Sequence, residues 1–94
     1  MHVSLIITNY NYGKYLTRSI QSALNQYCEF KDLFEVIVID DFSTDNSRVI
    51  IDNFQNDVKI IYNDKNYGLP YSLNKAIKHS RGMYTIRLDA DDWL

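Results

Sequence analysis

The sequence predicts an α/β fold with an open, mostly parallel four-stranded sheet and three helices, in the order β-α-β-α-β-α-β. Short apolar runs rich in β-branched residues, such as VSLIIT and FEVIVID, alternate with segments whose apolar residues recur at helical spacing. Polar, turn-forming clusters separate these segments. Strands separated by helices run parallel through right-handed crossovers, so helices are expected on both faces of the sheet.

The first strand and helix come from the amino-terminal part of the chain. Residues 3–8 (VSLIIT) form an apolar run that the turn-forming NYNYG ends, which predicts a strand buried on both faces. A helix is predicted from about Lys14 to Gln26, because its apolar residues fall on one stripe: Leu16, Ile20, Ala23, Leu24 and Tyr27.

The second strand is predicted over residues 34–40 (FEVIVID), and a short helix follows it near 45–55. The segment before that helix offers three candidate N-cap residues, Ser43, Thr44 and Asp45. The helix is expected to turn its apolar side chains toward the core: Val49, Ile50 and Phe54. The run VKIIY, residues 58–62, predicts the third strand.

The third helix and fourth strand complete the alternation. Pro70 suits the first turn of a helix, and Gly82 lies where that helix should have ended. The expected apolar stripe of the helix consists of Leu69, Leu73, Ala76 and Ile77. The run MYTIRL, residues 83–88, predicts the fourth strand.

Length and composition exclude several classes of protein. The 94 residues are expected to form one domain, 1–94, because a chain of this length supports a single core. The net charge of −2 gives no basic field for a polyphosphate backbone, so nucleic acid is not an expected partner. Cys28 is the only cysteine, and neither a secretory signal nor a membrane-spanning run is found. We expect a cytoplasmic location, with the inner face of the membrane as an alternative.

Three polar clusters follow predicted strands: TNYNYG, DDFSTD and DADD. The carboxyl ends of parallel strands lie at one edge of a sheet, where open α/β sheets bind ligands. The pair Asp40 and Asp41 has a structural alternative, since acids are favoured near a helix N-terminus. For DADD, the alternative is a solvated acidic turn.

The DADD segment predicts a metal site. Three carboxylates within four residues repel one another in a half-buried crevice, and a bound cation relieves that repulsion. Carboxylate and water oxygens suit Mg²⁺ or Mn²⁺, whereas one cysteine and two remote histidines make no credible zinc site. A magnesium ion often shares its shell with substrate phosphates, which indicates a diphosphate-bearing ligand.

The glycine pattern supports the interpretation that a metal ion, and not a glycine-rich loop, binds the phosphates of the ligand. The chain has only Gly13, Gly68 and Gly82, so both G-x-G-x-x-G and the P-loop motif are absent. A nucleobase would then need its own platform. Tyr10 can stack on a ring, and the carboxylate of Asp41 can accept an N–H from uracil, thymine or guanine, but not from cytosine.

Four segments together resemble the amino-terminal, nucleotide-binding half of a family-2 glycosyltransferase of the glycosyltransferase-A fold. They are VSLIITNYNYGKYLTRSIQSALNQ, FEVIVIDDFSTDNS, NDKNYGLPYSLNKAIKHSRGMY and RLDADDW. The resemblance covers nearly the whole chain and implies a Rossmann-like half-domain that binds a nucleotide-diphosphate sugar, with a UDP-sugar favoured. It also implies a divalent metal, Mn²⁺ or Mg²⁺, inversion at the anomeric carbon, and a role in polysaccharide or other glycan biosynthesis.

The resemblance assigns roles to particular positions. Thr8 and Tyr10 would line the base pocket, and Asp41 would bind the edge of the base. Asp89 and Asp91 would form the D-x-D pair that holds the metal, with Asp91 the direct ligand and Asp89 also near the ribose. Asp92 fits either task, and Asn66 with Gly68 matches the N-x-G turn beside the nucleotide.

Two features depart from the pattern. Leu73 stands before Asn74 where many relatives carry an Arg, so one cationic contact to the donor is missing. The family's catalytic base, an Asp or Glu, lies well downstream of the D-x-D element. We therefore expect that the catalytic residue is absent from these 94 residues, that the domain is truncated before its acceptor-binding part, and that the chain alone is inactive.

Two alternatives come from other classes. The first is a truncated module that binds nucleotide and metal weakly without catalysis, or one that pairs through an exposed sheet edge. The segment LDADDW also resembles the D-x-D element of haloacid-dehalogenase-like phosphotransferases. That element normally follows the first strand, whereas here it follows the fourth.

Overall fold

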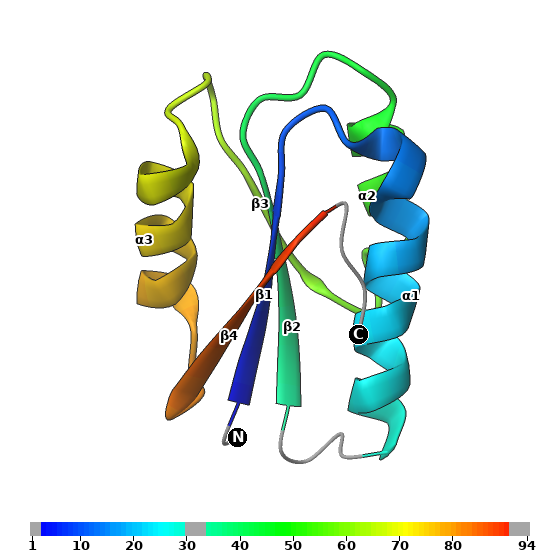
Figure 1. Cartoon of the computed structure of the whole chain (residues 1–94), viewed down its shortest axis with the longest axis vertical. Coiled ribbons are helices and arrows are strands. Elements are labelled where there is room, and N and C mark those ends of the chain that lie inside the picture. The colour runs from blue at the N-terminus through cyan, green and yellow to red at the C-terminus, as the bar shows by residue number, and fades with distance from the viewer. Residues whose placement is uncertain (1–2, 30–33, 91–94) are drawn as a thin grey trace.

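The computed structural model describes residues 3–29 and 34–90, apart from the side chains of 26–29. Within these residues strands and helices alternate in the predicted order (Figure 1). The elements are β1 (Val3–Asn9), α1 (Gly13–Glu29), β2 (Phe34–Asp40), α2 (Ser47–Asp52), β3 (Lys59–Tyr62), α3 (Leu69–His79) and β4 (Tyr84–Asp89). The predicted α/β fold class is confirmed.

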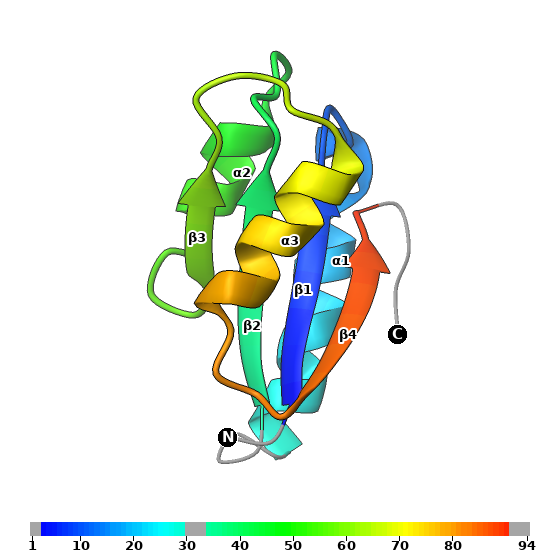
Figure 2. The same ribbon diagram turned by 90° about the vertical axis from the view of Figure 1, so that its left-hand side faces the viewer.

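All four strands run parallel, in the spatial order β3-β2-β1-β4 (Figure 2). On β1, Ile6 lies beside Ile37 of β2 on one side and Arg87 of β4 on the other. All residues of β1 after Val3 and of β2 after Phe34 are buried. These two strands have near-continuous apolar sequences because other elements cover both of their faces.

The helices divide between the two faces of the sheet. Figure 1 shows α1 and α2 on one face and α3 on the other. Alternate residues of β1 point to opposite faces, so Leu5 and Ile7 pack in the core under α1 and α2, whereas Ile6 packs under α3. The core under α3 is the smaller one, with Ile37, Ile39 and Ala76 also buried in it.

The strand order reverses beside β1. The chain moves outward from β1 to β2 and β3, and α3 then carries it back across the sheet to β4 on the other side of β1 (Figure 2). Loops on either side of such a reversal leave a crevice outside the carboxyl ends of the strands. The topology therefore predicts a ligand site at the ends of β1 and β4.

The helix α2 differs from its prediction. It is six residues long, its N-cap is Asn46, and no side chain caps it, so Ser43, Thr44 and Asp45 were wrong as N-caps. The backbone N–H groups of Thr44 and Asp45 instead donate to Asn11 Oδ1, at 2.7 and 3.2 Å. The helix turns Ile51, which is fully buried, toward the core and leaves Val49 66% exposed, the reverse of the expectation for Val49.

A buried carboxylate fixes the turn between α3 and β4. Glu35 Oε2 accepts hydrogen bonds from Ser4 Oγ at 2.6 Å and from the Arg81 N–H at 2.5 Å. Ser4 Oγ in turn accepts the Gly82 N–H at 2.9 Å. A Cβ at Gly82 would lie 2.5 Å from Ser4 N, so only glycine fits beside this strand. These contacts hold the start of β4 against β1.

Candidate functional site

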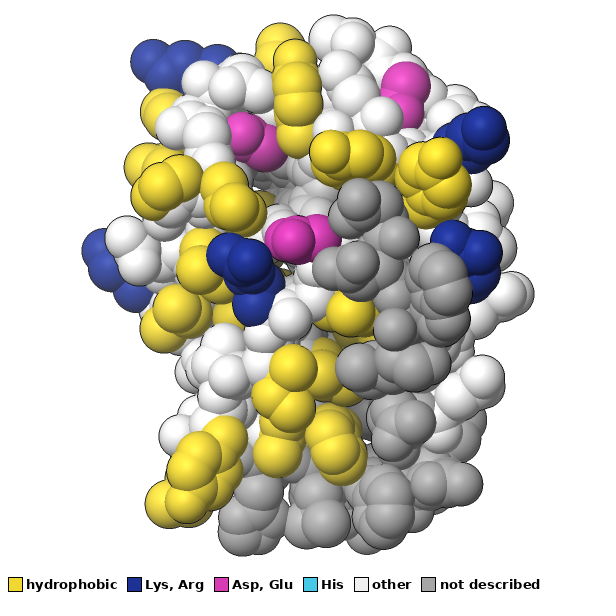
Figure 3. Space-filling model, viewed as in Figure 1, with side chains coloured by type: hydrophobic (Ala, Val, Ile, Leu, Met, Phe, Trp, Pro, Cys, Tyr) yellow, Lys and Arg dark blue, Asp and Glu magenta, His cyan; other side chains and the backbone are white. Residues whose placement is uncertain are grey.

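A pocket opens at the carboxyl ends of β1, β2 and β4, and its volume is about 260 Å³. It is lined by the end of β1 and the loop after it, by the residue that follows β2, by the first turn of α3 and by the end of β4. The lining residues are Thr8, Asn9, Tyr10, Tyr12, Asp41, Leu69, Ser72 and Asp89. On the face seen in Figure 3, acidic side chains border a hollow and apolar side chains surround it.

Four residues predicted from the sequence lie together in this pocket: Thr8, Tyr10, Asp41 and Asp89. Loops that are distant along the chain thus converge at one edge of the sheet, as expected from the parallel strand order. Asn66 does not line the pocket, and its side chain donates to the backbone carbonyl of Asp41 at 3.5 Å. Asp91 and Asp92 lie outside the described residues.

Asp41 is buried at the inner end of the pocket, with 6% of its surface exposed. Its Oδ1 accepts hydrogen bonds from Asn63 Nδ2 at 2.9 Å and from the Tyr67 N–H at 2.8 Å. Its Oδ2 accepts the Gly68 N–H at 2.8 Å. The carboxylate therefore anchors the β3–α3 loop and also faces the pocket. Gly68 has a φ of 92°, a conformation that favours glycine.

Asp89 and Thr8 form the opposite side of the pocket. Their strands are paired in register, and Thr8 Oγ1 donates to Asp89 Oδ1 at 3.2 Å. Arg87 Nε lies 3.5 Å from the same oxygen, and the Asp89 side chain is 37% exposed. A partly exposed carboxylate with one cationic neighbour retains capacity for a further ligand.

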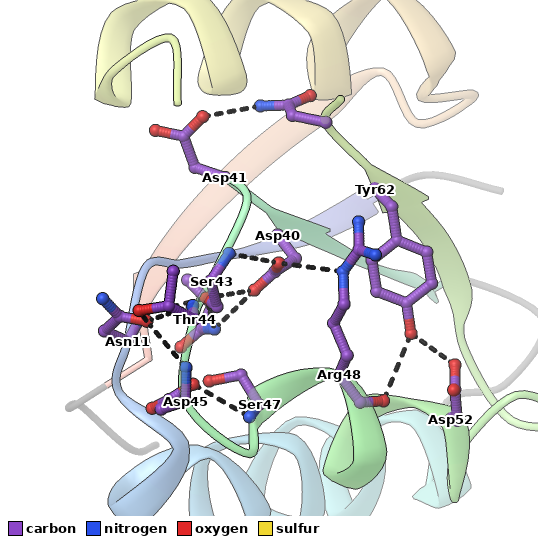
Figure 4. A network of polar contacts seen from close by, with 12 residues as sticks. Asn11, Asp40, Asp41, Ser43, Thr44, Asp45, Ser47, Arg48, Asp52 and Tyr62 are labelled. Carbon is purple, nitrogen blue, oxygen red and sulfur yellow. Dashed lines mark hydrogen bonds and ion pairs between the residues drawn. The ribbon is translucent and has the colours of Figure 1, made fainter. Parts of the chain in front are cut away.

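Asp40, next to Asp41, has a structural task. Figure 4 shows that Asp40 points toward Arg48, whereas Asp41 points away from it, toward α3. Asp40 is fully buried and accepts from Asn9 Nδ2 at 2.7 Å and Ser43 Oγ at 2.6 Å. Arg48 Nε lies 3.8 Å away. The side chain thus ties the loop after β1 to the loop after β2.

A second set of contacts joins these two loops where α1 begins. Asp45 Oδ2 accepts the Gly13 N–H at 3.0 Å, and Asp45 Oδ1 accepts the Ser47 N–H at 2.9 Å. Burial would raise the pKa of Asp45, yet the hydrogen bonds from Ser47 and Gly13 outweigh it and lower that pKa below its usual value. Hydrogen bonds to the Asp45 carboxylate therefore fix the end of the loop that carries Tyr10 and Tyr12, where α1 begins.

Exposed apolar and aromatic side chains line the mouth of the pocket. Tyr10, Tyr12 and Leu69 line it while remaining 44%, 43% and 43% exposed. Beside it, the rings of Tyr67 and Tyr71 stack with centroids 4.0 Å apart. The hydrogen bond that the Tyr67 hydroxyl donates to Asp64 raises the pKa of Tyr67 to about 12. Such rings suit contact with a flat ligand.

Sequence reasoning missed three lining residues: Asn9, Leu69 and Ser72. Asn9 closes β1 within a polar cluster, so its position was a usable signal. Leu69 was assigned to the apolar stripe of α3, but it lies at the very start of that helix, above the core. Ser72 is 2% exposed and faces the pocket one turn into α3, and nothing in its sequence context marks it.

The described residues were also compared with what a metal site requires. They contain no group of three or more His, Cys, Asp or Glu side chains that could hold a metal ion. Asp89 is a hard oxygen donor of the kind that Mg²⁺ and Mn²⁺ prefer, and it is the member of the predicted D-x-D pair that the structure describes. Among the described helices, none is long and apolar enough to cross a membrane.

Comparison with known proteins agrees with the geometry. The chain is 39% identical to the chondroitin synthase of Escherichia coli over 94 residues, covering 98% of this chain and 13% of that protein. Crystal structures of Staphylococcus aureus TarS 1–349 with UDP and with UDP-GlcNAc match with a TM-score of 0.87 and 35% identity. They cover 99% of this chain and 28% and 27% of TarS 1–349.

A further structural match supports the fold alone. The mannosyltransferase PcManGT from Pyrobaculum calidifontis, solved with GDP-Man and Mn²⁺, has a TM-score of 0.86 at 22% identity, over 98% of this chain and 28% of that protein. These neighbours have the glycosyltransferase-A fold, as expected. The chain spans 13% to 36% of the lengths of the curated relatives it matches.

The match to a family description extends over almost all of the chain. The model described as glycosyl transferase family 2 matches residues 4–94, which include the ends of β1, β2 and β4 and the first turn of α3. Every residue that lines the pocket lies within that match. With this sequence match, the parallel sheet and its pocket of converging loops, the chain belongs to glycosyltransferase family 2.

Proposed function

We propose that this chain forms the donor-binding part of a glycosyltransferase that moves a sugar from a nucleotide-diphosphate sugar, a UDP-sugar, to an acceptor hydroxyl. The observation that carries the proposal is the convergence of Tyr10, Asp41 and Asp89 in one pocket at the reversal of strand order. Family membership supports sugar transfer, and the TarS complexes with UDP and UDP-GlcNAc support the choice of donor.

The nucleobase is proposed to bind between Tyr10 and Asp41. Tyr10 offers a half-exposed ring that can stack on the base, and Asp41 offers a carboxylate oxygen to a ring N–H. Asp41 is held in place by hydrogen bonds from Asn63, Tyr67 and Gly68. Because its position is fixed before the base arrives, little conformational entropy is lost on binding.

The ribose and diphosphate are proposed to extend toward Asp89. Thr8 Oγ1 orients this carboxylate by a hydrogen bond to Oδ1. Asp89 and Asp91 are the proposed holders of a divalent ion, Mn²⁺ or Mg²⁺. When bound, such an ion stabilises the negative charge on the departing nucleoside diphosphate. This chain's own contribution is to hold the donor so that its sugar carbon faces the acceptor.

Proton removal from the acceptor is proposed to need a base outside the described residues. Of the two carboxylates that line the pocket, Asp41 already anchors a loop, and Asp89 is the one proposed to face the diphosphate. With the base on the far side of the sugar, the acceptor would attack opposite the leaving group and invert the anomeric carbon. No observation favours the phosphotransferase alternative. Binding of donor without product would favour the non-catalytic module.

Calorimetric titration of uridine and UDP, with and without Mn²⁺, tests this proposal. We expect Asp41→Asn to weaken binding of both ligands about tenfold or more, because a hydrogen bond to a charged acceptor is lost. Asp89→Asn should weaken binding of UDP in Mn²⁺ more than binding of uridine, because only UDP carries the diphosphate. Asp57→Asn, an exposed acid away from the pocket, is the matched control. Equal UDP affinity in all four proteins would contradict the proposal.

A further inference from the structure

Asn63 is a buried amide with a fixed orientation. It follows β3, is fully buried, and its Nδ2 donates to Asp41 Oδ1 at 2.9 Å and to Ser72 Oγ at 2.8 Å. Its Oδ1 accepts from Lys75 Nζ at 3.2 Å. An ammonium group has no acceptor and a carboxylate has no donor, so only this orientation of the amide satisfies both neighbours.

Lys75 is linked to the pocket residue Asp41 through Asn63. It lies on α3, is partly buried and is not among the residues that line the pocket. Its hydrogen bond holds the amide oxygen on the side away from Asp41, so the amide nitrogen stays on Asp41 and Ser72. Without that bond, the amide loses the charged partner that opposes rotation.

The hydrogen bonds to Asp41 leave little acceptor capacity. A carboxylate has about four lone-pair positions, two on each oxygen. Asn63 and the Tyr67 N–H use both positions of Oδ1, and the Gly68 N–H uses one position of Oδ2. Counted over the described part of the chain, one position on Oδ2 remains for a ligand.

We propose that Lys75 and Asn63 are positioning residues that set Asp41 to accept one further hydrogen bond, so that the pocket selects uracil or thymine over guanine. This deepens the proposed function and rests on it. Uracil and thymine present a single ring N–H beside carbonyl oxygens. Guanine presents two adjacent donors to a carboxylate, N1–H and N2–H, and one of them would stay unpaired and buried.

Ser72 provides the complementary donor. Its Oγ accepts from Asn63 Nδ2, it is 2% exposed, and it lines the same pocket as Asp41. Within the part of the chain that the structure describes, the hydroxyl proton of Ser72 has no acceptor, so it can donate to the carbonyl oxygen next to the ring N–H. One acceptor on Asp41 and one donor on Ser72 match the N–H and C=O of an imide base.

The test compares uridine, UDP and GDP in four proteins: the unaltered chain, Lys75→Met, Lys75→Arg and Lys78→Met. Lys78 is an exposed lysine of the same helix, so its variant removes the same charge without touching Asn63. We expect the unaltered chain to bind UDP at least about tenfold more tightly than GDP. Lys75→Met should weaken uridine and UDP about fivefold and narrow the preference over GDP. Lys75→Arg keeps the positive charge and should restore both the affinity for uridine and UDP and the preference for UDP over GDP.

Three results would overturn this inference while leaving the proposed function intact. They are equal effects of Lys75→Met and Lys78→Met, a loss confined to UDP with uridine unchanged, and equal affinity of the unaltered chain for UDP and GDP. A loss confined to UDP would mean that Lys75 attracts the phosphates directly.

A second readout needs no ligand. If Lys75 positions Asp41, the amide protons of Tyr67 and Gly68 should exchange with solvent faster in Lys75→Met than in Lys78→Met, because Asp41 holds both amides. Equal exchange rates would overturn the positioning role. Failure of the unaltered chain to bind UDP would instead contradict the proposed function, so the two failures can be told apart.

Discussion

At the scale of single residues, two adjacent acids have separate tasks. Asp40 ends β2 and points toward Arg48, whereas Asp41 points toward α3 and the pocket (Figure 4). Side chains of consecutive extended residues point to opposite sides, so one acid of the pair had to face each way. Asp40 thus has a structural role at the end of β2, whereas binding of a base by Asp41 stays a prediction. The sequence could place the pair at the edge of the sheet, but it could not predict which of the two acids faces the pocket.

Phe42 shows a backbone conformation that its residue type disfavours. Its φ is 65° and its ring is 44% exposed, between the pocket acid Asp41 and the loop residue Ser43. Left-handed backbone costs a residue with a Cβ roughly 1–2 kcal/mol. The loop contacts that tie Ser43 to Asp40 hold this conformation in place.

We predict that Phe42→Gly is more stable than Phe42→Ala by about 0.5–1 kcal/mol, after the greater freedom of glycine in the unfolded chain is subtracted. Both variants remove the same exposed ring, so their difference isolates the backbone. Denaturant unfolding of the two proteins measures it. If the alanine variant were as stable as the glycine variant, the loop would not hold residue 42 in the left-handed conformation.

At the scale of elements, the loop between β3 and α3 was the least predictable part of the site. Its polar sequence NDKNYG indicates a turn, but Asn63, the first residue of that loop, is fully buried. Burial of this amide depends on partners that follow β2 or lie on α3: Asp41, Ser72 and Lys75. A polar residue in a turn gives no local sign of such partners, so the network appears only once the elements are packed.

The turn before β4 depends on a charged side chain and should respond to pH. Burial would raise the pKa of Glu35, but the hydrogen bonds from Ser4 and Arg81 and the nearby Lys59 and Arg81 charges lower it below its usual value near 4.5. A lowered folded-state pKa stabilises the fold above the unfolded-state pKa. That contribution is lost as the pH falls through the folded-state value.

We therefore predict that the stability difference between the unaltered chain and Glu35→Gln is constant near neutral pH and shrinks as the pH falls below about 4.5. Denaturant unfolding at pH 7 and at pH 3 measures it, with Asp57→Asn as an exposed control. A difference that stayed constant or grew in acid would show that the Glu35 charge does not hold the turn.

At the scale of the whole molecule, the sequence predicts the fold well because the strands appear as short apolar runs and the helices as apolar residues at helical spacing. The alternation implies parallel strands, and parallel strands put the polar clusters at one edge. The alternation alone does not predict which strands are neighbours. The order β3-β2-β1-β4, with β4 beside β1, is what brings Asp89 next to Thr8.

We expect the ends of β1 and β4 and the residues that follow β1 and β2 to bind one nucleotide between them. The most direct measurement is a nuclear magnetic resonance titration of the isotope-labelled chain with UDP in Mg²⁺. We expect the amide signals of residues 8–12, 41, 67–69, 71, 72 and 89 to shift together, with one dissociation constant. Shifts on α1 and α2 without any at Asp41 and Asp89, or separate constants for those two residues, would contradict it.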